Sequence, residues 1–387
     1  MLNGSLEDRR VPFFLLKYRS SSPKNTRFPV KEKNSFLLPI GIRFSGKFRG
    51  IYLIFESYHF NPMSMLNYPI KFTPILKEKI WGGNKLKEIF NKDTTGDQVG
   101  ESWEISGVKG DVSVVENGPL QGKTLTDLQK EFKGEFVGEK IYQQFGEEFP
   151  LLIKFIDAKT ELSVQLHPND EIARRRHNSF GKTEMWYILQ ADKGAEINVG
   201  FKETVTKERY LDYLGAGKIT DLLNFEKVEK GDSFFIRTGK VHAIGAGVLL
   251  AEIQQTSDIT YRIYDWDRVD AQGNSRELHT ELALDAIDFE RKDDFRLTYE
   301  KTANTSNEVA SCEYFTTNYL QVTKDLSKDY SQLDSFVIYM CISGGVTVQA
   351  GEHAEVLKAG ETVLLPATSK EVKISGQEAE LLEVYIS

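Results

Sequence analysis

Polar side chains with the spacing of metal ligands lie in the segment Leu162–Pro168. On an extended strand alternate residues share one face, so Ser163, Gln165 and His167 point to one side and the apolar residues between them to the other. A polar row that faces a protein interior is costly unless a partner or a ligand satisfies it. Pro168 favours extended geometry at His167, which helps to fix the imidazole. The segment therefore predicts ligands held on one strand face.

Two further segments supply donors of the same kind. Lys182 and Glu184 alternate along one expected strand, and His242 follows another that is expected over residues 233–237. Two histidines, a carboxylate and an amide oxygen form the donor set of a zinc site with room for a water or substrate oxygen. Fe(II) also accepts two histidines and a carboxylate. A single histidine, or a Glu184 paired only with Lys182, is more often structural, but the combination favours a metal site.

If residues 258–264 form a strand, a third polar row made of Asp258, Thr260, Arg262 and Tyr264 shares one of its faces. An arginine directed into a barrel needs a carboxylate partner or an anion such as phosphate or an enediolate. A structural pair of Arg262 with Asp258 or Asp265 has about the same weight as an anion site on the pattern alone. The phosphate-binding motif GxxxxGK[ST] is absent from the sequence.

The elements that position these residues are short. Apolar alternation predicts strands over residues 105–115, 161–167, 185–190, 196–201, 233–237 and 248–254. Three- and four-residue spacing predicts helices over residues 125–136, 139–145, 207–223 and 277–287. Thr206 is the expected N-cap of the third helix. Many short strands with glycine-rich turns and few helices indicate a β-sandwich or β-barrel.

The barrel pattern occurs twice. The segment Lys230–Ile236 resembles Ala359–Leu365, and in both a Gly-acid turn precedes an apolar strand and a second apolar run follows. This predicts two copies of one β-barrel unit. Superposing the glycines brings His242 opposite Glu371, so the second copy lacks the histidine and we expect no metal there.

The charge of the chain is uneven. The 387 residues contain 49 Lys+Arg and 57 Asp+Glu, a net charge of −8, but residues 1–62 carry 11 and 4 and the remainder 38 and 53. An acidic body argues against non-specific nucleic-acid binding. Two cysteines exclude a disulfide framework and favour a reducing compartment. No apolar run approaches the about 18 residues of a membrane span, so we expect a cytoplasmic protein.

The basic leader has two interpretations. Residues 1–64 are rich in phenylalanine without helical or alternating spacing, and they lack the pattern of a secretory signal. One interpretation is that they are not native coding sequence and that translation starts at Met63 or Met65. The other is a flexible targeting or regulatory arm. We favour the first and expect the leader to be disordered.

The body resembles the type I mannose-6-phosphate isomerases, zinc-dependent enzymes of the cupin fold, in their short bacterial form. The matching segments are Ile80–Gly83, Gly100–Ser106, Gln165–Pro168, Lys182–Glu184, Gly239–Ala243 and Asp258–Arg262. They occur in order over about residues 67–290, which is more specific than any single motif. The leader matches nothing in the family.

The resemblance implies an organisation and a site. It implies a mainly β protein with two cupin (jelly-roll β-barrel) domains and a few short helices: a metal-binding catalytic domain over residues 65–300 and a non-catalytic one over residues 301–387. The zinc ligands that it implies are Gln165, His167, Glu184 and His242, with one Zn²⁺ per chain. It implies that Arg262 is the active-site arginine and that Lys182 and Asp258 line the substrate pocket.

The reaction implied by the resemblance interconverts mannose 6-phosphate and fructose 6-phosphate through a cis-enediol. Arg262 would hold negative charge, and either Lys182 or Asp258 would transfer the proton. The partner is then a small sugar phosphate, with neither nucleic acid nor membrane, and the chain acts as a monomer or a homodimer. An Fe(II) cupin dioxygenase and a non-enzymatic sugar-binding cupin are the alternatives. Gln165 and the Lys182/Arg262 pair fit a dioxygenase poorly. A binding protein would not need the Lys182/Glu184 and Asp258/Arg262 faces together.

Overall fold

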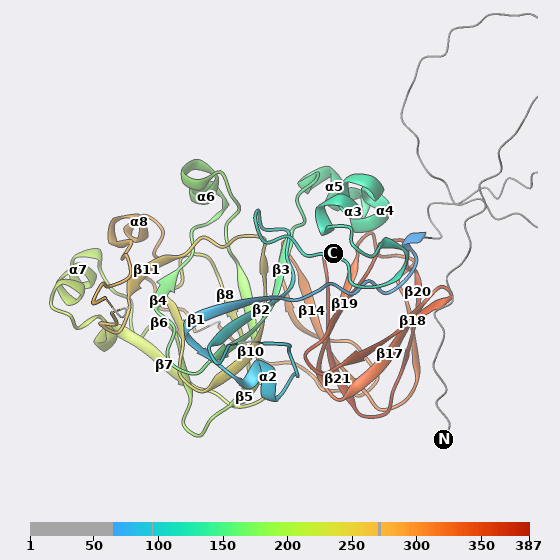
Figure 1. Ribbon diagram of the computed structural model, residues 1–387. Helices are drawn as coiled ribbons and strands as arrows, with labels where there is room; N and C mark the ends of the chain where they lie inside the picture. Colours follow the sequence, from blue (N-terminus) through green and yellow to red (C-terminus); the bar gives the residue numbers. More distant parts are fainter. Residues whose placement is uncertain (1–64, 95, 270–271, 294) are drawn as a thin grey trace, which may run out of the picture. The chain divides into compact units, whose positions relative to one another are not determined.

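A computed structural model describes residues 65–94, 96–269, 272–293 and 295–387. The leader predicted over residues 1–64 lies outside these residues. The described chain is mainly β, as the sequence predicts, and Figure 1 shows two β-barrels side by side. None of its helices has the length and apolar character needed to cross a membrane.

The first barrel consists of two sheets. One sheet has the order β1 (Ile75–Gly83), β2 (Val99–Ile105), β3 (Leu151–Ala158), β10 (Val248–Gln255), β5 (Glu184–Ala191), β8 (Ser233–Ile236) and β12 (Arg296–Leu297). The other has the order β11 (Tyr261–Tyr264), β4 (Val164–Leu166), β9 (His242–Ile244), β6 (Glu196–Phe201) and β7 (Leu223–Lys227). Apolar side chains of both sheets, such as Ile188 and Ile244, pack together between them.

The second barrel repeats this topology. Its first sheet has the order β13 (Asn307–Ser311), β14 (Thr316–Val322), β21 (Ala379–Tyr385), β16 (Val337–Ser343) and β19 (Thr362–Leu365). Its second sheet has the order β15 (Leu326–Asp329), β20 (Glu371–Ser375), β17 (Gly345–Ala350) and β18 (His353–Lys358). The order β3-β10-β5-β8 corresponds to β14-β21-β16-β19, and β4-β9-β6-β7 corresponds to β15-β20-β17-β18. The internal repeat predicted from the sequence is confirmed.

Strand register shows which residues correspond in the two barrels. Glu184 pairs with Ile236 in the first barrel, and Val337 occupies the same position opposite the last residue of β19 in the second. His242 and Glu371 each begin the corresponding strand, β9 or β20. The second barrel therefore has valine and glutamate where the first has glutamate and histidine.

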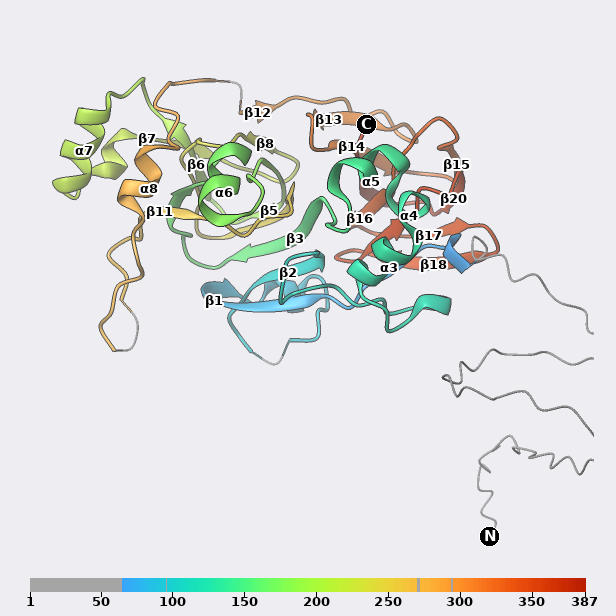
Figure 2. The ribbon, with the colours of Figure 1, turned by 90° about the horizontal axis from the view of Figure 1, so that it is seen from above.

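The helices are short. They are α2 (Lys85–Glu88), α3 (Leu125–Phe132), α4 (Gly134–Val137), α5 (Glu139–Phe145), α6 (Asp170–His177), α7 (Lys207–Gly215) and α8 (Thr280–Leu284), with 3₁₀ turns at Gly118–Leu120 and Ile219–Leu222. Seen from above, α6 lies over one end of the first barrel (Figure 2). Helices α7 and α8 lie at its far side from the second barrel (Figure 1).

Helices α3 to α5 leave the first barrel and pack on the second. The N–H of Ala367 donates to the carbonyl of Phe136, and that of Phe336 donates to Val137. The Asp334 carboxylate accepts from the first two N–H groups of α5, which its own N-cap residue Gly138 leaves without a side-chain partner. The excursion between β2 and β3 is therefore held by the C-terminal half of the chain.

Most of the predicted strands are confirmed. Those expected over 185–190, 196–201, 233–237 and 248–254 are β5, β6, β8 and β10, and the one over 161–167 is reduced to β4. The strand expected over 105–115 is wrong. The chain leaves β2 at Ile105 and turns at Gly110, whose φ of 93° is incompatible with a strand, and Val115 makes only an isolated bridge.

The predicted helices are present but mostly shorter. Lys133, with φ of 50°, interrupts the helix expected over 125–136 and separates α3 from α4. Residues 139–145 form α5 as expected. Thr206 caps α7 through its side chain, but the helix ends at Gly215, before Gly217 with φ of 68°. Only Thr280–Leu284 is helical within the stretch expected over 277–287.

A buried carboxylate lies inside the second barrel. Glu383 is 1% exposed, and it corresponds in register to Glu252 of the first barrel, since the two pair with Tyr339 and Trp186 respectively. Its partners are Lys328, Tyr330, Tyr339, Ser306 and Asn318. Burial alone would raise the pKa of Glu383, but Lys328 and the hydrogen bonds lower it below its ordinary value.

Replacing Glu383 with glutamine is expected to lower the free energy of unfolding by about 3 kcal/mol at pH 7, because Lys328 loses its counter-charge. A carboxyl whose pKa is depressed in the folded state stabilises above its unfolded pKa, here 4.5, and that stability disappears as the pH falls below it. Urea denaturation should therefore show the difference between wild type and Glu383→Gln shrinking below about pH 4.5. A difference that stays constant down to pH 3 would contradict this assignment.

Candidate active site and metal centre

Three buried side chains of the first barrel converge. His167 follows β4, Glu184 begins β5 and His242 begins β9. The Nε2 atoms of His167 and His242 each lie 3.5 Å from a different oxygen of Glu184, and the nearest ligand atoms of all three lie within 4.8 Å of one another. None of the three is more than 1% exposed. The structure thus brings together the two histidines and the carboxylate predicted from the sequence.

Both imidazoles are oriented by backbone carbonyls. His167 Nδ1 lies 2.8 Å from the carbonyl oxygen of Ile259, and His242 Nδ1 lies 2.8 Å from that of Lys240. A carbonyl only accepts, so Nδ1 carries the proton and Nε2 offers its lone pair to the cluster. Burial lowers the pKa of His242 to about 3 and that of His167 well below its usual value, with Lys182 adding to both. Both rings are therefore neutral.

The donor set fits a metal ion. Among the described residues, Glu184 Oε1 and His242 Nε2 have no hydrogen-bond partner although both are fully buried. Buried acceptors without donors are costly, and a divalent cation would satisfy them together. Burial raises the pKa of Glu184 to about 7, with Glu252 adding to the effect and Lys182 opposing it. A cation beside Glu184 would favour the ionised form.

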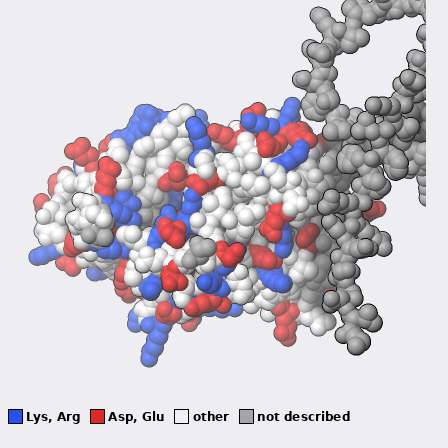
Figure 3. Space-filling view, in the orientation of Figure 1, with Lys and Arg blue, Asp and Glu red and all other residues white. Residues whose placement is uncertain are grey.

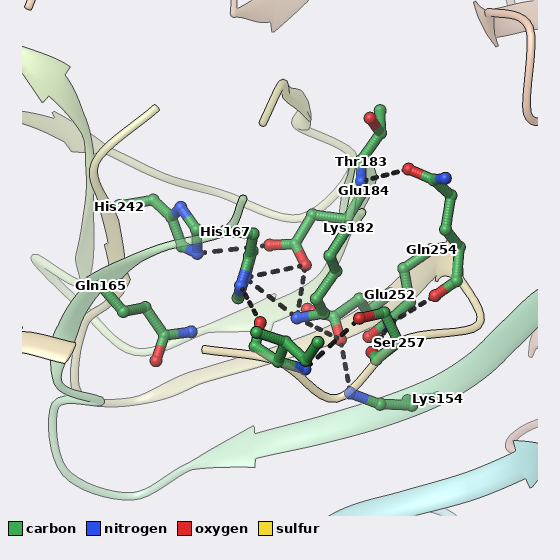
Figure 4. Close-up of polar contacts among 12 residues, drawn as sticks. Lys154, Gln165, His167, Lys182, Thr183, Glu184, His242, Glu252, Gln254 and Ser257 are labelled. Carbon is green, nitrogen blue, oxygen red and sulfur yellow. Dashed lines mark hydrogen bonds and ion pairs between the residues drawn. The ribbon is translucent and has the colours of Figure 1, made fainter. Parts of the chain in front are cut away.

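Lys182 contacts this cluster directly. Its Nζ lies 2.7 Å from Glu184 Oε2 and 3.0 Å from His167 Nε2, and the side chain is 5% exposed (Figure 4). Gln165 lies on β4 opposite His242 of β9, and its side chain extends toward the cluster in Figure 4. Four expected ligands and the lysine therefore occupy one region.

A pocket of about 350 Å³ opens onto the cluster. Gln165, Lys182, His242, Asp258 and Arg262 all line it. Its size is that of a site for a small molecule. On the face shown in Figure 3, cationic and anionic side chains are interspersed, so specific residues of the pocket must select the charge of a ligand.

Arg262 lines the pocket without an ion-pair partner among the described residues. Asp265 is one of the two carboxylates considered from the sequence. It forms ion pairs with Arg268 and Arg276. The Nη1 of Arg262 donates to the carbonyl of Glu277, and its buried Nε has no acceptor. Burial and the neighbouring Arg276 lower the pKa of Arg262. The guanidinium keeps an uncompensated charge that suits an anion.

Asp258 also faces the pocket, although its backbone is not in a strand. Strand β11 contains only Tyr261–Tyr264, so the extended strand expected from Asp258 onward is wrong. The predicted grouping nevertheless holds, because Asp258, Thr260 and Arg262 line the same pocket. Asp258 is exposed, in contrast to the buried Lys182.

Two charged residues that line the pocket were not predicted from the sequence. Glu252 of β10 and Lys154 of β3 line the pocket, and their charged groups lie 2.9 Å apart. Burial would raise the pKa of Glu252, but Lys154 and Lys182 lower it to about 2, with a hydrogen bond from Trp186. The available signal was a charged residue with apolar neighbours on both sides in each strand, since such residues are rarely buried without a partner.

Comparison with known proteins follows this geometry. Residues 70–203 match the family described as "Phosphomannose isomerase type I, catalytic domain", and residues 304–386 match "Mannose-6-phosphate isomerase, cupin domain". The first match contains His167 and Glu184, two of the three converging residues, and the second lies within the repeated barrel.

Relatives that match most of the chain belong to the same family. The mannose-6-phosphate isomerase ManA of Bacillus subtilis is 38% identical over 81% of this chain and 97% of its own length. That of Streptococcus mutans is 35% identical over 80% and 95%. The crystal structure of a mannose 6-phosphate isomerase from B. subtilis superposes with a TM-score of 0.75 at 33% identity, covering 82% of this chain and all of the other. The chain belongs to the type I phosphomannose isomerase family.

Proposed function

We propose that this protein is a zinc-dependent aldose–ketose isomerase that interconverts mannose 6-phosphate and fructose 6-phosphate through a cis-enediol. The observation that supports this most is the buried cluster of His167, Glu184 and His242, with neutral imidazoles and unsatisfied acceptors beside a pocket lined by an unpaired Arg262. The relatives named above carry that activity in their names.

The proposed metal site holds one Zn²⁺ per chain, with Gln165 as the fourth ligand after His167, Glu184 and His242. When bound, zinc supplies a Lewis acid that polarises the oxygens at C1 and C2 of the sugar. Mixed imidazole, amide and carboxylate donors suit zinc, whereas a calcium or magnesium site is built from oxygen ligands.

The residues of the chain would provide the remaining steps. Arg262 binds negative charge, either on the phosphate or on the enediolate oxygens. The reaction moves a proton between C2 and C1, and we propose two candidates for the group that carries it. Lys182 lies beside the cluster, and the Asp258 carboxylate lines the open side of the pocket. Glu252 and Lys154 complete the polar wall.

The remaining expectations belong to this proposal. We assign residues 65–300 to the catalytic cupin domain and residues 301–387 to a non-catalytic one, because the strands of the two barrels fall on either side of that boundary. The partner is a soluble sugar phosphate and the location is the cytoplasm, consistent with the free cysteines Cys312 and Cys341. Residues 1–64 lie outside the catalytic unit in this assignment.

A coupled assay on mannose 6-phosphate tests the proposal. We expect turnover by the isolated protein, a fall of more than about tenfold after prolonged chelation, and recovery when zinc is returned. Metal analysis should give about one zinc per chain. Iron with oxygen uptake would favour a dioxygenase instead, and sugar phosphate binding without turnover would favour a binding protein.

A further inference from the structure

The segment that carries Lys182 is held by side chains as well as by the backbone. Residues 181–183 precede β5, and their backbone bonds are single ones: the N–H of Lys182 donates to the carbonyl of Pro168, and the N–H of Gln255 donates to the carbonyl of Thr183. The N–H of Gly181 donates to Asp170 Oδ1 at 2.7 Å, and the N–H of Thr183 donates to Gln255 Oε1 at 2.8 Å. The N–H groups on either side of Lys182 are thereby held by two side-chain acceptors, which contribute to the position of its side chain.

Asp170 is the centre of this arrangement. Its Oδ1 also accepts from Gln255 Nε2 at 3.1 Å, and its Oδ2 accepts from the Tyr314 hydroxyl at 2.7 Å. Close approach requires glycine at position 181, because a Cβ there would lie 2.7 Å from the backbone nitrogen of Asp170. Burial and the Asp170 carboxylate raise the pKa of Tyr314, so the phenol is a donor at neutral pH.

The Asp170 carboxylate is close in the chain to one proposed ligand and is hydrogen-bonded to the segment that precedes another. Asp170 is the first residue of α6, three positions after His167, and the helix is capped by the Asn169 side chain. Through Gly181 and Gln255 it holds the segment that leads to Glu184. One carboxylate therefore links the chain just after His167 to the chain just before Glu184.

Tyr314 belongs to the other barrel. It lies in the turn between β13 and β14, and its hydroxyl is bonded to a residue of the catalytic barrel. A hydrogen bond to a charged acceptor is stronger than one between neutral groups. The turn of the second barrel is thus connected to Lys182 through Asp170 and Gln255.

We propose that Tyr314, Asp170 and Gln255 are positioning residues for Lys182 and Glu184, and that the second barrel contributes to catalysis through the Tyr314 hydroxyl. The inference rests on the proposed isomerase function. A displacement of about 1 Å in a reacting group can reduce a rate about 100-fold, so loss of one bond in this chain should be visible in kcat.

Tyr314→Phe removes only the donor to Asp170. We expect kcat to fall about tenfold and KM to change less than about twofold, because substrate contacts remain. Tyr319→Phe is the matched control, since it removes the hydroxyl of another tyrosine of the second barrel that donates to a carboxylate, that of Glu380. The control should retain wild-type kcat.

Two variants of Asp170 distinguish the effect of its hydrogen bonds from the effect of its negative charge. Asp170→Asn keeps Oδ1 as acceptor and presents its amide to the tyrosine oxygen, so kcat should stay within about threefold of wild type. Asp170→Ala removes both acceptors and should lower kcat about 100-fold. Melting temperature and zinc content show whether the alanine variant is folded and loaded. If it does not fold, Tyr314→Phe alone decides.

Amide hydrogen exchange gives a readout that does not depend on activity. Exchange at residues 181–183 should be faster in the full-length Tyr314→Phe protein than in wild type and in Tyr319→Phe. If Tyr314→Phe matches its control in both kcat and exchange, the inference is overturned. If the wild type has no isomerase activity but exchange responds as expected, the proposed function fails and the positioning role stands.

Discussion

Replacing Glu184 with glutamine is expected to lower kcat about 10⁴-fold and to leave the protein with little zinc. Glu184 supplies the single negative charge between two neutral imidazoles, with each Nε2 3.5 Å from one of its oxygens. A metal that stabilises a developing oxyanion lowers the activation free energy by several kcal/mol. Each 1.36 kcal/mol corresponds to about tenfold in rate, so loss of the metal lowers kcat by several powers of ten. Kinetics in the coupled assay and metal analysis of the same sample measure both effects.

The matched control is Glu383→Gln, the same change at a buried carboxylate of the second barrel. It destabilises the fold without touching the pocket, so at a temperature where it is folded its kcat should equal that of wild type. A Glu184→Gln protein that keeps a full zinc content and more than about a tenth of the activity would remove Glu184 from the metal site.

Replacing Arg262 with alanine is expected to lower kcat about 10³-fold while zinc content stays unchanged. The guanidinium lines the pocket, and the nearby Asp265 is already paired with Arg268 and Arg276. Removing a preorganised donor to a developing oxyanion costs on the order of 10²–10³ in rate. Arg262→Lys keeps the charge but loses the planar fork, so we expect a loss of about 100-fold.

Arg268→Lys is the control for Arg262. Arg268 lies in the loop that follows β11, and as lysine it would keep its charge pair with Asp265. It does not line the pocket. Its kcat should stay within about threefold of wild type. If Arg262→Ala lost activity only through weaker zinc binding, the proposed role of Arg262 in holding substrate charge would be wrong.

The proposed metal ligands were predictable because their signal is local. Alternation along Leu162–Pro168 puts Gln165 and His167 on one strand face, and that pattern survives although β4 is only three residues long. The pairing of Gln165 with His242 across β4 and β9 then follows from the barrel topology. These three positions needed no knowledge of distant loops.

The partners of Arg262 could not be predicted in the same way. Asp265 is close in sequence, but Arg268 and Arg276 from the following loop occupy it instead. That choice depends on how a long loop returns to the sheet, which no periodicity encodes. Glu252 was not predicted for a related reason. Its charge can be buried in β10 because Lys154 of the neighbouring strand β3 pairs with it.

The excursion between β2 and β3 has a consequence for synthesis of the protein on the ribosome. Phe136 and Val137 are fully buried, and their carbonyls are bonded by residues translated about two hundred positions later. Until Phe336 and Ala367 emerge, this part of the nascent chain exposes apolar surface and unpaired backbone groups, which are typical of aggregation-prone species. The two barrels therefore complete their folding together. A fragment truncated after the first barrel would keep the apolar surface of this segment exposed.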